Sequence, residues 1–173
     1  MELHKEMSLL VEDLALLRYE LAVLCKRRPE QLLGRPATPA GIARLESQWE
    51  VRLPADYRAF LQLHDGWKKF SGDNDLLATD SYRDRDLMAH VTQLKDADPD
   101  ASSGLVVMGS ILTSTLQFFD PNGIALDGGM PLVYWSRGEI VAKYSSFKAM
   151  LARWADISRN QIAEERRRLR RPD

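Results

Sequence analysis

Residues 1–27 place apolar side chains at alternating steps of four and three, which is the spacing of a helix with one apolar seam. The seam contains Leu3, Met7, Leu10, Leu14, Leu17, Leu21 and Leu24, with no interrupting Gly or Pro. Four more apolar residues make it wider than the seam of a two-stranded coiled coil: Leu9, Val11, Leu16 and Val23. We therefore expect this helix to dock on its own domain. Homodimerisation, or capture of a partner helix through residues 1–27, stays open as the alternative.

The sequence GRPATPAG at residues 34–41 interrupts this pattern. Because glycine and proline disfavour regular structure, it is predicted to link residues 1–33 to an α+β domain at residues 42–158. Within it, Thr38 and Pro39 are typical of an N-cap and of a first helical residue. Apolar residues then recur at helical spacing, at Ile42, Leu45 and Trp49.

The sequence LPADYRAFLQLHDGW, at residues 53–67, predicts a second helix. Pro54 suits its first position, because the missing N–H of proline would have no helical partner there. Asp56 lies in the first turn, where a carboxylate meets unpaired amides, and Gly66 suits the left-handed cap that ends a helix. One apolar stripe contains Tyr57, Phe60 and Leu61 and ends at His64. The acid–histidine–acid content of this stretch, which suggests an active site, is thus explained by helix ends and burial.

Strand signals begin only at Leu105, because residues 68–103 are mostly polar, with one short helix predicted within Leu87 to Leu94. The runs LVVM, TLQFF, PLVYW and IVAKY follow, and turn sequences at 120–123, 127–129 and 136–139 indicate an antiparallel meander. Phe147, Met150, Leu151 and Trp154 then predict a last helix, which decays into a basic, frayed end or tail at residues 159–173. The predicted class is α+β, with N-terminal helices, an antiparallel β-meander sheet and a C-terminal helix packed on the sheet.

Charge, cysteine content and hydropathy make several classes of protein less consistent with this sequence. The 173 residues include 24 Lys and Arg against 25 Asp and Glu, so no global charge favours nucleic acid or an acidic substrate. The single cysteine, Cys25, excludes an intramolecular disulfide and a cysteine-only zinc site. Acidic residues interrupt the N-terminal leucines, unlike a signal peptide, and no stretch is long enough to cross a bilayer. We expect a soluble cytoplasmic protein.

Candidate chemistry is sparse. The three histidines, His4, His64 and His90, lack metal-ligand spacing, and no nucleophile elbow, P-loop or dinucleotide fingerprint occurs. We therefore predict a protein that is not an enzyme, with no catalytic residues, no metal and no cofactor. The basic run at residues 166–171 is interpreted first as a solvated helix end. Pairing with the acidic N-terminal helix and, last, nucleic-acid binding are the alternatives.

At this point the sequence resembles the Smi/Knr branch of the SUKH superfamily, over roughly residues 38–155. The family pattern is a helix with apolar residues and a glutamate, then Leu-Pro, an aromatic residue, a Phe-Leu pair and a Gly. A small-residue step into a helix with an early Phe follows later. The matching residues are Ile42, Leu45, Glu46, Leu53, Pro54, Tyr57, Phe60, Leu61, Gly66, Ser145, Ser146 and Phe147. Asp65 and Trp67 flank Gly66 where the family often has Asn and a second Gly.

The resemblance implies binding rather than catalysis. Bacterial members are typically immunity proteins that bind and block a cognate toxin, often a nuclease, and fungal relatives are regulatory scaffolds. We therefore expect a toxin-binding immunity protein, with a regulatory scaffold that acts through the N-terminal helix as the alternative. An enzyme that uses His64 or His90 with nearby acids is a third hypothesis.

For the partner contacts we select the polar middle segment. Carboxylates there can mimic nucleic-acid charge and speed association with a basic groove, and aromatic side chains can anchor an interface. Arg83 and Arg85 interrupt the acids. The selected residues are Trp67, Asp73, Asp75, Asp80, Tyr82, Asp84 and Asp86.

Overall fold

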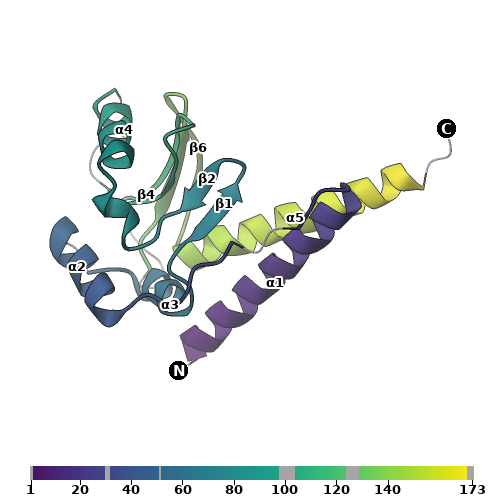
Figure 1. Cartoon of the computed structure of the whole chain (residues 1–173), viewed down its shortest axis with the longest axis horizontal. Helices are drawn as coiled ribbons and strands as arrows, with labels where there is room; N and C mark the ends of the chain where they lie inside the picture. Colours follow the sequence, from purple (N-terminus) through teal and green to yellow (C-terminus); the bar gives the residue numbers. More distant parts are fainter. Residues whose placement is uncertain (1, 30–31, 51, 98–103, 124–128, 171–173) are drawn as a thin grey trace. The chain divides into compact units, whose positions relative to one another are not determined.

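Six short strands form one antiparallel sheet, and their order in space is their order along the chain (Figure 1). They are β1 (Trp67–Ser71), β2 (Asn74–Leu76), β3 (Val106–Gly109), β4 (Thr115–Phe119), β5 (Leu132–Ser136) and β6 (Glu139–Tyr144). The helices are α1 (Glu2–Leu24), α2 (Pro39–Trp49), α3 (Ala55–Leu63), the 3-10 helix η1 (Ser81–Arg83), α4 (Arg85–Asp96) and α5 (Phe147–Leu169). The computed structural model describes residues 2–29, 32–50, 52–97, 104–123 and 129–170. The predicted α+β class is confirmed.

The chain divides into two units. Residues Leu32–Phe147 form the first, which we call the sheet domain. It contains all six strands, the helices from α2 to α4, and the first residue of α5. Residues Met1–Gln31 and Lys148–Asp173 form the second, which we call the two-helix unit because it contains α1 and the rest of α5.

The first two strands contradict the prediction that strands begin only at Leu105. β1 and β2 form a hairpin with Gly72 in its turn, and β2 pairs onward with β3, where Asp75 lies opposite Gly109. β2 has only three residues, too few for a period-two pattern, and two adjacent exposed lysines interrupt β1. β2 is fixed by pairing with β3, far along the chain, and β1 by pairing with β2. The local sequence does not encode the pairing with β3.

The starts of α2 and α3 follow from their capping residues. The side-chain oxygen of Thr38 accepts a hydrogen bond from the Gly41 amide at 3.0 Å, and Pro39 is the first residue of α2, as predicted. α3 begins at Ala55, so Pro54 is its N-cap residue rather than its first helical residue. The prediction for Pro54 was therefore wrong by one position.

Gly66 does not cap α3 as the sequence predicted. The helix ends at Leu63, and His64 is its C-cap in an extended conformation. Gly66 lies two residues further on, with φ +85°, and a Cβ there would lie 2.8 Å from the Leu76 carbonyl oxygen. The glycine is therefore required by the left-handed backbone and by the close approach of the Leu76 carbonyl, rather than by the helix end.

Glu46 connects α2 to the segment that begins α3. Its Oε1 accepts a hydrogen bond from the Leu53 amide at 2.8 Å and another from the Arg58 guanidinium. A charged acceptor with two donors is a strong form of hydrogen bonding. The glutamate of the family pattern thus holds two helices of the sheet domain together.

Aromatic side chains form the core between α3 and the sheet. Tyr57 and Phe60 of α3 contact Phe147, with ring centroids 4.9 and 5.1 Å from it. Phe119 of β4 lies 5.4 Å from the Tyr57 ring. All four side chains are buried. Because buried aromatic rings contribute large apolar areas, this cluster fixes α3 and the first residue of α5 on the sheet.

The two edges of the sheet differ. Residues 32–34 run beside β1, where the Lys68 amide donates to the Leu32 carbonyl at 3.0 Å. At the opposite edge, β6 pairs with β5 alone among the described strands, and none of its side chains is fully buried. Ile140 and Val141 of β6 are exposed. One edge is therefore covered by the chain itself and the other is open.

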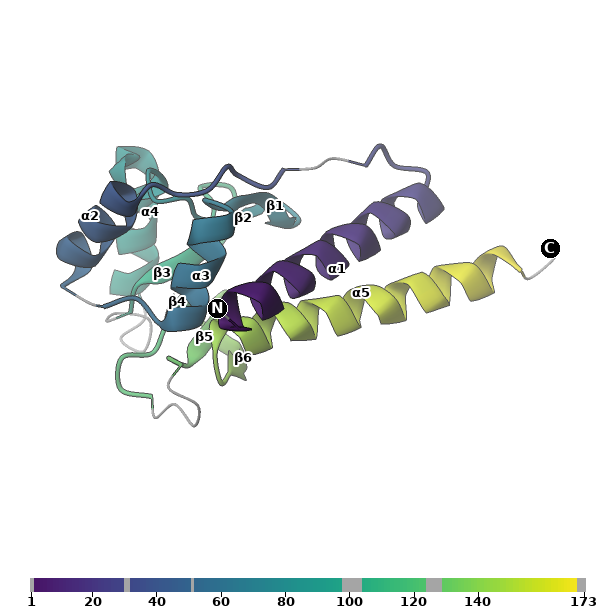
Figure 2. The ribbon, with the colours of Figure 1, turned by 90° about the horizontal axis from the view of Figure 1, so that it is seen from below.

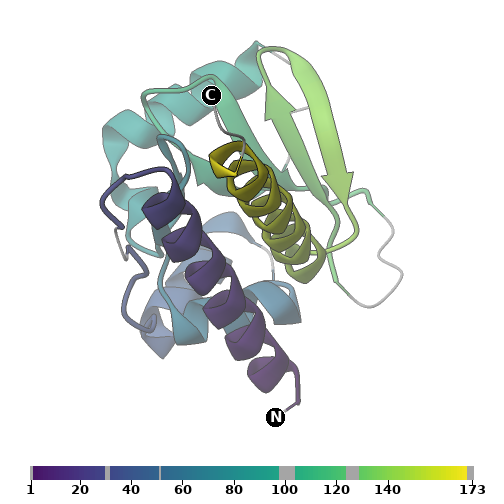
Figure 3. The same ribbon diagram turned by 90° about the vertical axis from the view of Figure 1, so that its right-hand side faces the viewer.

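In the two-helix unit, α1 and α5 lie side by side and run in the same direction (Figures 2 and 3). Three ion pairs join them: Glu6 with Lys148, Asp13 with Arg159, and Glu20 with Arg166. The residue numbers of the pairs rise along both helices, in agreement with a parallel arrangement. Because these side chains are partly exposed, each pair contributes about 0–1 kcal/mol and mainly sets the register.

The predicted seam of α1 is covered, but a second apolar stripe is not. Met7 and Leu14 of the seam are buried, as is Val11, and the other seam residues are partly buried. The second stripe is exposed and contains Leu9, Leu16, Tyr19 and Val23. Three of its members are seven residues apart, so they lie on one side of α1. The seam therefore docks within the chain, whereas the second stripe faces solvent.

The basic C-terminal run is helical as far as Leu169. α5 continues to Leu169, and the Arg166 guanidinium lies 2.5 Å from a Glu20 carboxylate oxygen. The neighbouring Arg167 and Arg168 are exposed. Pairing with the acidic N-terminal helix therefore accounts for Arg166, whereas Arg168 pairs with Glu165 of its own helix at 3.4 Å and Arg167 is solvated.

Candidate partner-binding surface

The seven residues selected for partner contact fall into two groups. Asp73 and Asp75 lie on the β1–β2 hairpin, and Trp67 is the first residue of β1. The second group lies on η1 and the start of α4 and contains Asp80, Tyr82, Asp84 and Asp86. Figure 1 shows the hairpin and α4 on different sides of the sheet domain. The structure therefore does not bring the five aspartates together on one surface.

The group at the start of α4 is held by hydrogen bonds and an ion pair. Asp84 is the N-cap of α4, and its side chain accepts from the amides of Asp86 and Leu87 at 3.0 and 3.1 Å. Asp80 pairs with Arg44 of α2 at 2.7 Å, although 73% of its side chain stays exposed. Asp86 is exposed in the first helical turn. The Asp80 and Asp84 carboxylates thus have defined contacts, and Arg44 and Arg83 balance part of the charge of Asp80.

The hairpin group is smaller and mixed in charge. The Asp75 carboxylate accepts from the Lys69 backbone amide at 2.6 Å, next to a left-handed Lys69 with φ 50°. Asp73 is exposed in the turn. Because Lys68 and Lys69 are exposed on the adjacent strand, the hairpin does not present a purely acidic surface.

Both aromatic side chains that the sequence offered as anchors are buried. Trp67 is 5% exposed and packs on Phe70 with ring centroids 5.4 Å apart. Tyr82 is 4% exposed, and its hydroxyl donates to the Val106 carbonyl at 2.5 Å. Burial raises the pKa of the Tyr82 hydroxyl well above its ordinary value. These two residues therefore belong to the core rather than to the surface. The polar residues next to them in the sequence had suggested that they would be exposed.

Trp49 is an aromatic residue near the candidate surface that the sequence analysis did not select for partner contact. Its spacing with Ile42 and Leu45 had assigned it to the buried stripe of α2. It is half-buried, and its ring lies edge-on to Tyr82 with centroids 6.1 Å apart. The Lys95 ammonium lies 5.1 Å from its ring centroid and donates to the Gly104 carbonyl at 2.5 Å. Burial lowers the pKa of Lys95 to about 8. No local signal in the sequence indicates this tryptophan–lysine pair, since 46 positions separate the two residues.

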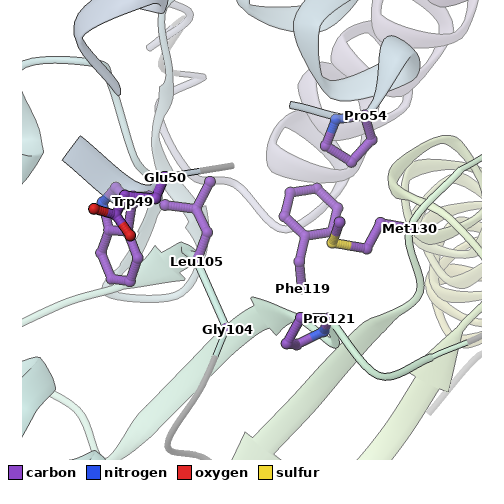
Figure 4. Close-up of a pocket in the computed structure, with 8 residues that line it drawn as sticks. All are labelled: Trp49, Glu50, Pro54, Gly104, Leu105, Phe119, Pro121 and Met130. Atoms are coloured by element: carbon purple, nitrogen blue, oxygen red, sulfur yellow. The ribbon is translucent and has the colours of Figure 1, made fainter. Parts of the chain in front are cut away.

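An apolar cavity of about 180 Å³ lies beside Trp49 (Figure 4). Its walls include Trp49, Pro54, Leu105, Phe119 and Met130, with Glu50 next to the tryptophan. A wider depression of about 420 Å³ adjoins it through the shared residues Pro54 and Met130, and is lined by Arg52 and Arg58. The cavity and the depression lie entirely within the sheet domain.

The residues of the suspected active site have structural hydrogen bonds. His64 and His90 each donate a ring N–H to a backbone carbonyl, at 3.1 and 2.8 Å. The Asp65 carboxylate accepts from the amide and hydroxyl of Thr79 at 2.6 and 2.8 Å. In the part of the chain that the structure describes, no group of three or more His, Cys, Asp or Glu could hold a metal ion. No helix in those same ranges has the length and hydropathy to span a membrane.

Comparison with known proteins agrees with the fold. A search of curated proteins found no match. Residues 36–153, more than half of the chain, match the model of the SMI1 / KNR4 family (SUKH-1). The residues of the family pattern have clear roles within this range, because Glu46 joins two helices and Phe147 completes the aromatic core. The chain therefore belongs to the SMI1 / KNR4 family (SUKH-1).

Proposed function

We propose that this protein is a cytoplasmic immunity protein that binds a cognate bacterial toxin and blocks it by occlusion. Membership of the family supports a binding role. The observation that carries the proposal is the exposed carboxylate group of Asp80, Asp84 and Asp86 on η1 and α4. Because Asp84 caps the helix and Asp80 pairs with Arg44, this surface needs little further ordering when a partner binds.

A nuclease is the toxin class that these aspartates suit best, since a nuclease binds its substrate in a basic groove. Arg44, Arg83 and Arg85 lie among the acids, so the surface has an alternating rather than uniform charge. Such a pattern favours a fixed register and a faster association more than a large gain in affinity. Asp73 and Asp75 form a separate second contact, and Trp67 and Tyr82 hold the two surfaces in place from below.

The direct test is titration of the full chain with the product of the neighbouring toxin gene, followed by calorimetry and by assay of the toxin. We expect a tight complex of fixed stoichiometry and loss of toxin activity at that stoichiometry. Absence of a tight complex would contradict the proposed function.

Charge variants locate the contact. Asp86→Lys should lower the association rate several-fold, and the effect should fade at high salt because exposed charges are screened. Glu164→Lys, an exposed carboxylate of the two-helix unit, is the matched control and should leave the rate nearly unchanged. Equal effects of the two substitutions would place the contact elsewhere.

The exposed stripe on α1 favours a second candidate, a regulatory scaffold that acts through residues 1–27, including self-association as a homodimer. Leu16 is 70% exposed, and Leu9 and Val23 lie seven residues to either side. The double substitution Leu9→Glu and Leu16→Glu in the full chain should abolish concentration-dependent sedimentation if the stripe forms an interface. If toxin neutralisation survives this change, the stripe is an accessory to the immunity function.

The proposed mechanism needs no catalysis by this chain and no cofactor. His64 and His90, the residues of the third hypothesis, serve the fold through their carbonyl contacts. An activity that disappears on replacing either histidine, in a variant that folds normally, would establish an enzyme instead.

A further inference from the structure

We propose that the cavity beside Trp49 is the anchor pocket for a protein partner, where one phenyl or leucyl side chain inserts while an acidic neighbour meets Arg52. This inference deepens the proposed binding function and rests on it. Four properties of the pocket support it: its size, its apolar walls, an unpaired donor and the charges around it.

The size and the walls suit one apolar side chain. A dry cavity of about 150 Å³ lined by aliphatic and aromatic groups takes a benzene molecule, so a cavity of about 180 Å³ has room for a phenyl or leucyl group. Leu105 and Phe119 in its walls are buried and belong to the sheet region, so the pocket exists before a partner arrives. Interface hot spots have this form, an apolar anchor in a preformed pocket.

Trp49 carries a polar group that the described residues leave unsatisfied. Its indole N–H is buried and has no hydrogen-bond acceptor among them. Buried donors without an acceptor are rare in folded proteins and need an explanation. The tryptophan ring contacts Tyr82 and Lys95, and its buried N–H is not exposed to the cavity in this structure. In the proposal the ring turns when a segment inserts, and the N–H then donates to a backbone carbonyl of that segment.

The surrounding charges select a chain segment with an acidic neighbour. The adjoining depression is lined by Arg52 and Arg58. Arg58 is bound to the Glu46 carboxylate, whereas Arg52 is exposed, so Arg52 supplies the cation for a partner. A ligand that fills the apolar cavity and also contacts Arg52 in the depression must be larger than one side chain. A peptide segment meets this requirement, whereas a small apolar molecule does not.

A ring contact links the pocket to the segment that carries the acidic surface. Trp49 forms one wall of the cavity and also contacts the buried ring of Tyr82 in η1, and Asp80 and Asp84 lie two positions to either side of Tyr82 in the sequence. An apolar pocket bordered by ordered charged residues matches the anatomy of a specific interface, with an apolar centre and a polar rim. The inference therefore assigns the centre to the Trp49 cavity and the rim to the aspartates.

The first experiment tests the pocket without a toxin. The full chain is titrated with acetyl-Asp-Phe-Gly-amide and acetyl-Gly-Phe-Asp-amide, and the Trp49 indole N–H resonance, assigned by its loss in Trp49→Phe, is followed. At least one peptide should give a saturable shift, and replacing its Phe by Ala should weaken binding about tenfold or more, because a buried phenyl group is lost. Absence of a saturable shift up to about 50 mM, or benzene binding as tightly as the peptide, overturns the proposal.

Protein variants test the same pocket from the other side. Met130→Trp, at a half-buried wall position, should fill the cavity and abolish the shift, whereas Ile111→Trp, at an exposed turn, is the matched control and should not. Arg52→Ala, a surface change with little effect on folding, should remove the preference for the Asp peptide over its Asn analogue. Binding that survives both Met130→Trp and Arg52→Ala unchanged overturns the proposal.

Failure of this inference is distinguishable from failure of the proposed function. If the toxin binds tightly to the protein and equally tightly to Met130→Trp, the immunity function stands and the anchor pocket is wrong. If the peptides bind as expected but no toxin does, the pocket stands as a protein-binding site and the immunity function is wrong.

Discussion

Different interactions stabilise the sheet domain and the two-helix unit, each taken by itself. The sheet domain buries a cluster of aromatic rings from α3, β4 and the first residue of α5. The two-helix unit also contains buried apolar side chains on both helices, such as Met7, Leu14 and Leu151. It has partly exposed ion pairs along α1 and α5 as well, and it leaves an apolar stripe of α1 in solvent. Burial of a large apolar side chain contributes about 1.5–3 kcal/mol, whereas a surface ion pair contributes about 0–1 kcal/mol.

The buried aromatic residues of the sheet domain specify the fold. The exposed apolar residues of α1 are not needed for it and are available for association. The family match at residues 36–153 covers nearly all of the sheet domain and only the first residues of α5 beyond it. The buried aromatic residues of the family pattern lie in that range, and α1 lies outside it. We infer that substitutions in the sheet domain act through stability, and that those on the exposed face of α1 act through association.

The largest expected effect is on the aromatic core. Phe60→Ala should lower the free energy of unfolding by about 3–5 kcal/mol, because it removes a fully buried ring and leaves a cavity. Leu16→Ala, at an exposed position of α1, should change it by less than about 0.5 kcal/mol. Urea unfolding of both variants measures the two values. Similar losses would show that the exposed stripe of α1 contributes as much to stability as the aromatic core.

The second prediction concerns backbone rather than side-chain packing in the sheet domain. Gly66→Ala should destabilise by about 2–4 kcal/mol, because it combines a left-handed residue with a Cβ 2.8 Å from the Leu76 carbonyl oxygen. Gly72→Ala has a positive φ but open space around the new Cβ, so about 1–2 kcal/mol is expected. The difference, measured by thermal or urea unfolding, isolates the close contact. Equal losses would show that only the dihedral angle matters.

The third prediction contrasts a buried charge in the sheet domain with the exposed charges of the two-helix unit. Burial lowers the pKa of Lys95 from its ordinary value of 10.5, which the unfolded chain keeps, to about 8 in the folded chain. Between these values the unfolded chain binds a proton that the folded chain has released, so the contribution of Lys95 to stability rises with pH. Below about pH 8 both states are protonated and the contribution is constant.

Lys95→Met removes this dependence. The free energy of unfolding of the wild-type protein minus that of Lys95→Met should therefore increase between pH 8 and 10.5 and stay level below pH 8. Urea titrations at several pH values measure the difference. Parallel curves for the two proteins would show that Lys95 titrates alike in both states.

The smallest expected effect is on the ion pairs of the two-helix unit. Arg159→Ala removes the contacts with Asp13 and Asp156, and should lower the free energy of unfolding by about 0–1 kcal/mol. Raising the salt to about 1 M, where the Debye length is about 3 Å, should remove most of this difference. A loss above about 2 kcal/mol that persists in high salt would mean that the pair is effectively buried.

The sequence predicted those helices and strands whose capping residues or apolar pattern lie within a short stretch of the chain. The Thr38 cap, the apolar stripe of α3 and the four β-rich runs of the meander are all encoded within a few neighbouring residues. β2 was missed because it is short and pairs with the distant β3, and β1 was missed because exposed lysines interrupt it and it pairs only with β2 among the named strands. α4 was predicted as a helix within Leu87 to Leu94 and runs from Arg85 to Asp96, because Asp84 caps it and secures its first turn. The predicted turn at 127–129 lies mostly outside the described residues.

The candidate site was harder to predict than the fold. The acidic positions are exposed as expected, since charged side chains in a turn-rich segment seldom find a buried partner. Trp67 and Tyr82 were expected to be available as anchors, yet strand pairing and a hydrogen bond to Val106 bury them. The pocket beside Trp49 depends on residues from α2, β4 and the turns beyond it, and no single stretch of sequence contains that information.

The unequal edges of the sheet limit how copies of this protein can assemble. A fibre that grows by edge-to-edge strand pairing needs two open edges on every copy, so that each arrival offers a new site for the next. Here residues 32–34 run beside the first two residues of β1, whereas β6 pairs with β5 alone among the described strands. Two copies that met through β6 would cover both of their open edges. Association of native copies through β6 would therefore end at a dimer and would not continue into a fibre.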